Sequence, residues 1–188
     1  MADLSGEVNY RNFAGTPGKN PKYLSDSLTP WYGTWTGIGG VGSPAVAYDN
    51  LPSDGTIVGR IWKNLTNSGT IALEFTNPQN INECELSFYI KAENADCQLY
   101  LMLSANPAAT YTTQPYCYRL LYGAGASPTV WTSRTFILKR NGSGFTLPGG
   151  IIPEHEVIFQ SCKSINIYRD APAPNRIIEL AGLNIRRL

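Results

Sequence analysis

CELSFYIKAENADCQLYLMLS (residues 84–104) carries the clearest periodicity in the chain. Apolar side chains occupy every second position at residues 86–90, and leucines do the same at residues 99–103. A period of two is typical of a β-strand with one buried face and one solvent-facing face. If Ala92 pairs with Cys97 across the polar turn between them, every apolar residue falls on one side. The stretch therefore predicts an antiparallel hairpin with one packed face.

Segments of the same kind recur along the chain and are separated by Asn, Gly and Pro. We expect strands at residues 56–62, 70–75, 84–91, 97–104, 116–121, 131–140, 163–169 and 176–187. In the last of these, a bulge at Ala181-Gly182 restores the alternation. Short strands at regular spacing are typical of a sandwich, and no segment keeps a helical period over three turns. The sequence therefore predicts an all-β fold, an antiparallel β-sandwich of jelly-roll type, over residues 51–188.

Residues 1–50 lack this regularity and are interpreted as an extended N-terminal arm followed by a glycine-rich loop region. The arm contains several prolines and the single aromatics Tyr10, Phe13 and Tyr23, without a period that could build a core of its own. Two interpretations stay open: the arm docks these aromatics on a partner, or it lies as a long loop across its own domain. The glycine-rich stretch is expected to be a flexible loop, since it lacks the Lys-Ser/Thr and the helix of a phosphate-binding loop.

Composition restricts the partners of the chain. The 188 residues are 43% hydrophobic and 15% charged, against about 25% charged in a typical domain. The net charge of +1 creates no strong field for nucleic acid or an anionic membrane, so neither is expected as a partner.

No apolar run approaches the roughly 18 residues of a membrane-spanning helix, and the N-terminal residues lack the apolar core of a signal peptide. We expect synthesis in a cytoplasm.

The cysteines are expected to be unbridged thiols. The four are Cys84, Cys97, Cys117 and Cys162, and no two form a CxxC pair. In the hairpin register above, Cys84 and Cys97 are not opposite each other. Buried thiols in a reducing compartment are therefore favoured over disulfides or a metal site.

Catalytic chemistry has little support in the sequence. The only histidine, His155, stands between Glu154 and Glu156 after a Pro-Gly-rich turn, and it is expected to be a solvated loop residue. HEV is not the HExxH motif of zinc proteases. A carboxylate pair of the glycosidase kind stays open, with Glu74, Glu83, Glu85, Glu93, Glu154, Glu156 and Glu179 as candidates. We expect no enzyme activity, no catalytic residue, no cofactor and no metal.

Large aromatic side chains favour binding rather than catalysis. Sugar rings stack on flat aromatic faces through apolar contact. The candidate carbohydrate-binding residues are Trp31, Tyr32, Trp35 and Trp62. Trp62 ends a predicted strand and Trp131 begins one, so packing is the competing interpretation for both. The Trp31–Trp35 group is the best exposed candidate, because its surroundings are glycine-rich and without a period.

Four segments resemble a known family. They are TIALEFTNPQNINECELSFYIKA (70–92), VWTSRTFILKR (130–140), CKSINIYRD (162–170) and RIIELAGLNIRRL (176–188). In this order they resemble the galactose-binding-like jelly roll that is common in carbohydrate-binding modules, over about two-thirds of the chain. Many such modules carry an Asp-Asn step in the closing pair, where this chain has Glu179 followed by Leu180-Ala181. A calcium or sugar site of the family type is therefore not expected at that position.

The resemblance leads to two expectations about function. The same fold class occurs in bacteriophage virion proteins, which implies a non-enzymatic structural subunit of a phage particle, a capsid decoration or tail appendage. Such a subunit would be located in the virion, form a homo-oligomer and dock its arm on other virion proteins. The alternative is a carbohydrate-binding module or receptor-binding tip that holds a surface glycan on its aromatics.

Overall fold

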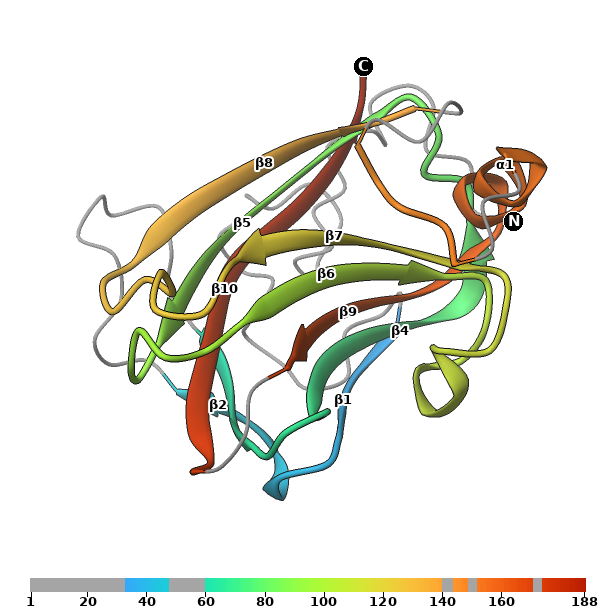
Figure 1. The fold of residues 1–188 in the computed structure, drawn as a ribbon. Coiled ribbons are helices and arrows are strands. Elements are labelled where there is room, and N and C mark those ends of the chain that lie inside the picture. Colours follow the sequence, from blue (N-terminus) through green and yellow to red (C-terminus); the bar gives the residue numbers. More distant parts are fainter. Residues whose placement is uncertain (1–32, 48–59, 140–143, 149–151, 171–173) are drawn as a thin grey trace.

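The computed structural model describes residues 33–47, 60–139, 144–148, 152–170 and 174–188. These residues form two five-stranded antiparallel sheets packed face to face (Figure 1). Sheet A has the strand order β1-β4-β9-β6-β7, and sheet B has the order β2-β3-β10-β5-β8. The prediction of an all-β sandwich is confirmed.

The elements of the described residues alternate repeatedly between the two sheets. Their bounds are β1 Gly33–Ile38, β2 Val41–Ala47, β3 Arg60–Leu65, β4 Thr70–Gln79, β5 Cys84–Ala92, β6 Leu99–Ser104, the 3-10 helix η3 Ala108–Thr110, β7 Tyr116–Tyr122, β8 Thr132–Leu138, α1 Ile152–Gln160, β9 Cys162–Arg169 and β10 Arg176–Arg187. Each of the eight predicted strands overlaps one of these. In β10 the register with β5 shifts between Ala181 and Asn184, which confirms the predicted bulge.

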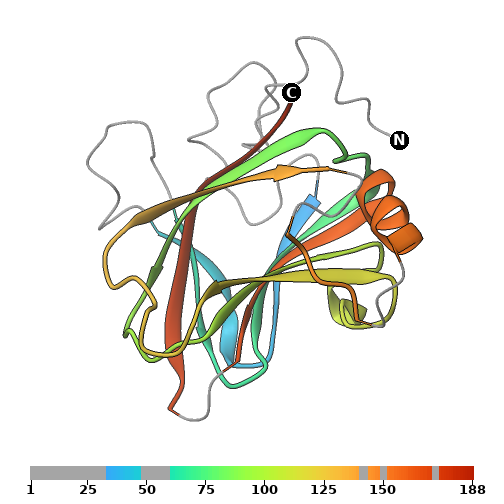
Figure 2. The same cartoon turned by 45° about the horizontal axis from the view of Figure 1, so that its top comes forward.

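The core lies between the sheets, which Figure 2 shows as two separate layers. Strand β5 alternates strictly between buried and half-buried residues, with Leu86, Phe88 and Ile90 turned inward. The alternate leucines of β6 face them from sheet A. Burying each large apolar side chain contributes about 1.5–3 kcal/mol, so this double layer supplies most of the stability of the fold.

The predicted hairpin between residues 84–91 and 97–104 is wrong, although its buried faces are right. Strand β5 pairs with β8 and β10 in sheet B, whereas β6 pairs with β7 and β9 in sheet A. A period of two determines which face of a strand is buried but not which strand lies beside it. The residues between β5 and β6 suffice to cross the roughly 10 Å between packed sheets, so the two apolar faces meet across the core instead of side by side.

The glycine-rich stretch contributes strands to both sheets. Strand β1 pairs with β4 in sheet A and β2 pairs with β3 in sheet B. Between them Gly39 and Gly40 have φ values of 66° and 89°, a conformation that only glycine adopts at low cost. The stretch predicted as a flexible loop is therefore a tight turn that carries the chain from one sheet to the other. The arm residues Tyr10, Phe13 and Tyr23 lie outside the described residues, as does the predicted boundary at residue 50.

The solvated loop predicted around His155 is instead helical. The side chain of His155 is 7% exposed and packs against Phe159 of the same helix, with ring centres 5.9 Å apart. Burial lowers the pKa of the His155 imidazole. The nine residues of α1 are shorter than three turns, so the sequence shows no helical period there, although Pro153 in its first turn is a usual helix start.

The four cysteines are buried and unbridged, as predicted. Burial raises the pKa of the Cys162 thiol to about 12, and it also raises the pKa of Cys117. These thiols are therefore protonated, apolar core residues. Over the described part of the chain, no helix has the length and apolar character needed to cross a membrane.

Candidate functional site

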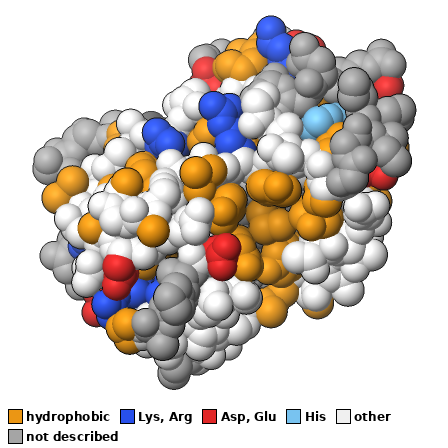
Figure 3. Space-filling view, in the orientation of Figure 1, with side chains coloured by type: hydrophobic (Ala, Val, Ile, Leu, Met, Phe, Trp, Pro, Cys, Tyr) orange, Lys and Arg blue, Asp and Glu red, His pale blue; other side chains and the backbone are white. Residues whose placement is uncertain are grey.

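The outer face of sheet A carries a groove of about 570 Å³ that we call the tyrosine groove. Figure 3 shows hydrophobic side chains gathered around this hollow on the face that looks toward the viewer. The lining residues are Ser68, Tyr100, Met102, Tyr111, Thr112, Tyr116, Tyr118, Tyr168 and Asp170. Five tyrosines thus line one surface hollow.

Strand alternation places four of these tyrosines on the outer face. Tyr100 of β6 stands between inward-facing leucines, Tyr116 and Tyr118 of β7 flank buried Cys117, and Tyr168 of β9 follows buried Ile167. The order β9-β6-β7 then brings the three strands side by side. Tyr100 lies directly opposite Tyr168, and Met102 lies opposite Tyr118. Cross-strand neighbours on one face are within contact distance, so the rings form one continuous surface.

The rings stand at steep angles to one another. Tyr100 and Tyr118 are 6.0 Å apart between ring centres, with an interplanar angle of 78°. Tyr100 and Tyr168 are 5.9 Å apart at 48°, and Tyr111 and Tyr168 are 6.1 Å apart at 47°. Tyr100 therefore contacts two other rings and joins them into one aromatic cluster.

Tyr111 reaches the cluster from the segment after η3, which packs on the outer face of sheet A. The chain around η3 is attached to the sheet by two side-chain hydrogen bonds: the Ala108 amide donates to Glu74 Oε2 at 3.0 Å, and Ser164 Oγ donates to the Asn106 carbonyl at 2.9 Å. These bonds hold Tyr111 as a wall of the groove.

The groove combines aromatic faces with neutral hydroxyl groups. Burial raises the pKa of Tyr111 to about 12, and burial also raises the pKa values of Tyr100 and Tyr116. These three hydroxyls therefore stay protonated at neutral pH, and every tyrosine hydroxyl of the groove can both donate and accept hydrogen bonds. Two are already oriented: Tyr100 Oη accepts from Gln98 Nε2 at 2.8 Å, and Tyr168 Oη lies 3.2 Å from Ser68 Oγ.

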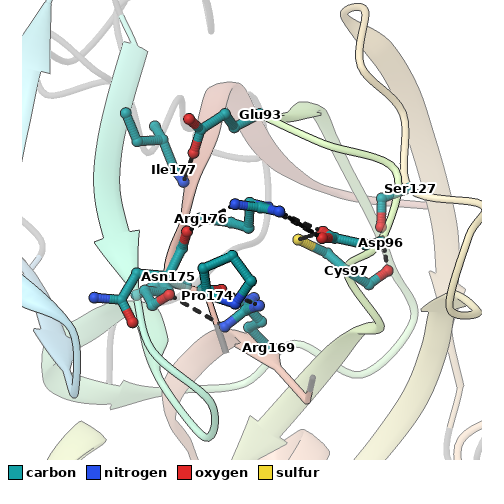
Figure 4. Close-up of polar contacts among 10 residues, drawn as sticks. Glu93, Asp96, Cys97, Ser127, Arg169, Pro174, Asn175, Arg176 and Ile177 are labelled. Carbon is teal, nitrogen blue, oxygen red and sulfur yellow. Dashed lines mark hydrogen bonds and ion pairs between the residues drawn. The ribbon is translucent and has the colours of Figure 1, made fainter. Parts of the chain in front are cut away.

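A buried arginine holds one end of the groove in place. Arg169 lies between Tyr168 and Asp170 in the chain and turns to the opposite side of the strand, where it is fully buried. Its Nη2 donates to the Pro174 carbonyl at 2.8 Å (Figure 4), and its Nη1 donates to the Leu65 carbonyl at 3.2 Å. Because Arg169 is anchored inward, its two neighbours are held on the outer face.

The first residue of β10 is attached to the turn after β5 by an ion pair. Arg176 Nη2 lies 2.7 Å from Asp96 Oδ2, and Arg176 Nε donates to Asp96 Oδ1 at 3.1 Å (Figure 4). The Arg176 guanidinium holds the pKa of the Asp96 carboxyl below its usual range. Beside them, Ser127 Oγ donates to the Cys97 carbonyl. Loops from both sheets are thus joined at this end of the sandwich.

The outer face of sheet B carries a second hollow, of about 360 Å³, which we call the tryptophan hollow. It is lined by Trp62, Lys91, Ala92, Glu93, Thr129, Ile177 and Glu179. Trp62 and Lys91 flank Glu179 in the strand pairing, and Lys91 Nζ lies 3.4 Å from Glu179 Oε1. Glu93 Oε2 accepts a hydrogen bond from the Ile177 amide at 3.0 Å. The carboxylates of this hollow are therefore bound to groups of the chain itself.

The structure separates the predicted aromatic candidates. Trp62 is half-buried in the tryptophan hollow, and Lys91 Nζ lies 5.9 Å from the ring centre of Trp131. Trp35 is a core residue with 4% exposure, because β1 turns it inward, so it offers no ring to a ligand. Trp31 and Tyr32 lie outside the described residues.

Among the carboxylates considered for catalysis, Glu93 and Glu179 both line the tryptophan hollow. Neither is placed as a general acid or base, since one binds a backbone amide and the other a lysine. In the part of the chain that the structure describes, no three His, Cys, Asp or Glu residues gather as metal ligands do.

The tyrosine groove was missed by sequence reasoning, although a signal was present. The chain has 11 tyrosines, and several alternate with buried residues on predicted strands. A Tyr on the solvent-facing side of three strands that become neighbours forms an aromatic surface. The sequence does not reveal that β9 lies beside β6, so it does not show that these tyrosines come together.

No family model and no curated protein matches the sequence. Among solved structures, PfGH50B superposes with a TM-score of 0.54 at 12% identity, over 87% of this chain and 23% of that chain. The enzymatically active domain of bacteriophage CBA120 tailspike protein 4 superposes with a TM-score of 0.50 at 9% identity, over 97% of this chain and 22% of that chain. A family 30 carbohydrate-binding module superposes with a TM-score of 0.49 at 13% identity, over 83% of this chain and 85% of that chain. The chain thus spans less than a quarter of the first two proteins, and the likeness concerns the fold: a jelly-roll-like β-sandwich.

Proposed function

We propose that this protein binds carbohydrate chains through the tyrosine groove of sheet A. The observation that carries the proposal is the set of five tyrosines converging on one open hollow from β6, β7, β9 and the segment after η3. A sugar ring has an apolar face and a rim of hydroxyls. Tyrosine matches both, with an apolar ring and a hydroxyl that donates and accepts. The hollow is also within the range of volumes typical of ligand sites.

The groove supports the alternative stated from the sequence, carbohydrate binding, but on other residues. Of the four predicted sugar-binding aromatics, the described Trp35 is in the core and Trp62 lies on the opposite face. The structural role in a phage particle, the virion location, the oligomer and the arm contacts stay predictions. A receptor-binding tip on a particle would unite both hypotheses. That the chain is not an enzyme also stays a prediction.

The experiment is a glycan-array screen followed by calorimetric titration of neutral hexasaccharides such as cellohexaose, mannohexaose and the N-acetylglucosamine hexamer. Tyr100→Ala should weaken binding about tenfold or more, because Tyr100 contacts two other rings of the groove. Tyr100→Phe keeps the ring and isolates the contribution of its hydroxyl. Denaturant melts of both variants show whether the fold is intact.

The variant Trp62→Ala separates the two hollows. If it abolishes glycan binding while Tyr100→Ala leaves affinity unchanged, the tryptophan hollow is the site and the proposal is wrong. Absence of binding across the whole array would contradict carbohydrate binding itself.

A further inference from the structure

The tyrosine groove is shaped as a set of walls rather than as a flat platform. Its ring pairs meet at 78°, 48° and 47°, around Tyr100 and Tyr168. A flat platform for stacked sugar rings calls for aromatic faces that are nearly coplanar. Inclined rings from three neighbouring strands and from Tyr111 instead border one hollow from several sides, and an ammonium cation in such a hollow can contact more than one electron-rich ring.

The charge of the lining has one sign. Asp170 is the only charged residue among those that line the groove, so no lysine or arginine belongs to the described lining. The backbone of Asp170 is fixed, since its amide donates to the Gln98 carbonyl at 2.8 Å. The guanidinium of the adjacent Arg169 binds carbonyls of Leu65 and Pro174 on the other side of the strand.

From the inclined rings and the single carboxylate we infer that the groove selects a glycan that carries a positively charged amine, such as a chain with unacetylated amino sugars. This inference rests on the proposed carbohydrate function and names its ligand class. The ammonium group lies against the faces of Tyr100 and Tyr168, near the Asp170 carboxylate, while the remaining rings contact the apolar face of the sugar. A cation within about 6 Å of an aromatic ring centre is attracted by the ring, and a carboxylate adds a charged partner.

The test compares two ligands that differ only in the amine. Glucosamine hexamer is cationic at about pH 6, and N-acetylglucosamine hexamer has the same backbone with neutral amides. Calorimetric titration of the full chain should show about tenfold tighter binding of the glucosamine hexamer. The preference should shrink when NaCl is raised from about 0.05 M to about 0.5 M, because salt screens the attraction to Asp170. The net charge of the protein is +1, so its overall charge does not attract the cationic hexamer and does not explain tighter binding of that hexamer.

Two variants test whether Asp170 causes the preference for the glucosamine hexamer. Asp170→Asn should weaken binding of the glucosamine hexamer more than binding of the acetylated hexamer, so that the ratio of affinities falls toward one. Glu93→Gln removes a carboxylate from the tryptophan hollow on the opposite face and should leave the ratio unchanged. A preference that survives Asp170→Asn would overturn the inference.

The remaining outcomes separate the inference from the function on which it rests. Equal affinity for both hexamers, with Tyr100→Ala weakening both, overturns cation selection and retains glycan binding in the groove. Failure of both hexamers to bind overturns the inference, and a neutral glycan found on the array would then still support the function.

Discussion

The two outer faces of the sandwich differ in how their polar groups are used. In the tryptophan hollow of sheet B, Glu179 binds Lys91 and Glu93 binds a backbone amide. In the tyrosine groove of sheet A, aromatic hydroxyls and one carboxylate border an open hollow. A carboxylate that is bound inside the chain gains little from a ligand, whereas a tyrosine hydroxyl with one internal hydrogen bond can still exchange water for a sugar hydroxyl. The comparison teaches that ring size alone, which favoured the tryptophans, is a weak guide to a binding face.

The largest expected effect comes from the core that lies beneath both faces. Phe88→Ala should reduce the free energy of unfolding by about 3–5 kcal/mol, because the ring is 1% exposed and stacks with Phe136. Ser87→Ala, next along β5 but on the outer face, should change it by less than about 0.5 kcal/mol. Urea unfolding curves measure both. Equal losses would show that the assignment of inner and outer faces is wrong.

The second effect tests whether the tryptophan hollow is structural. Glu179→Ala removes the partner of Lys91 and should cost about 1–2 kcal/mol of unfolding free energy, since a partly buried ammonium loses its counter-charge. Glu179→Gln is the matched variant that keeps the shape and removes the charge. Glycan affinity should stay the same in both variants. A loss of glycan affinity without a change in stability would assign binding to sheet B.

The smallest effect concerns the exposed ion pair between Asp96 and Arg176. Because Arg176 lowers the pKa of Asp96 in the folded protein, the pair stabilises the fold above the pKa of an unfolded Asp, about 3.9, and this contribution is lost as the pH falls through the folded value. The wild type should therefore exceed Asp96→Asn slightly in urea midpoint at neutral pH and match it in strong acid. The opposite trend, a difference that grows on acidification, would contradict the assigned partner.

Much of the fold was predictable from alternation alone. The inward positions of β5 and β6 and the bounds of β10 with its bulge all follow from where apolar side chains recur. Alternation carries no information about strand neighbours, which is why β5 and β6 were placed in one hairpin. Helix α1 is too short to show a helical period, so the burial of His155 could not be anticipated either.

The candidate site was harder to predict because it is assembled from distant segments. Tyr100 and Tyr168 are far apart in the chain and become direct neighbours only when β9 enters sheet A beside β6. Trp35 was favoured for its glycine-rich surroundings, yet those glycines form the turn that fixes β1 and buries the ring. Tyrosines on the solvent-facing side of a strand resemble ordinary surface residues until the sheet order is known.

Mapping the ligand contact by amide NMR tests the central claim most directly. The isotope-labelled full chain is titrated with the hexasaccharide that binds best, and the resonances that move are assigned to residues. Glycan binding in the tyrosine groove predicts that the shifts cluster around Tyr100, Tyr118 and Tyr168 on β6, β7 and β9. Shifts that cluster around Trp62 and Glu179 on β3 and β10, with the groove unperturbed, would contradict it.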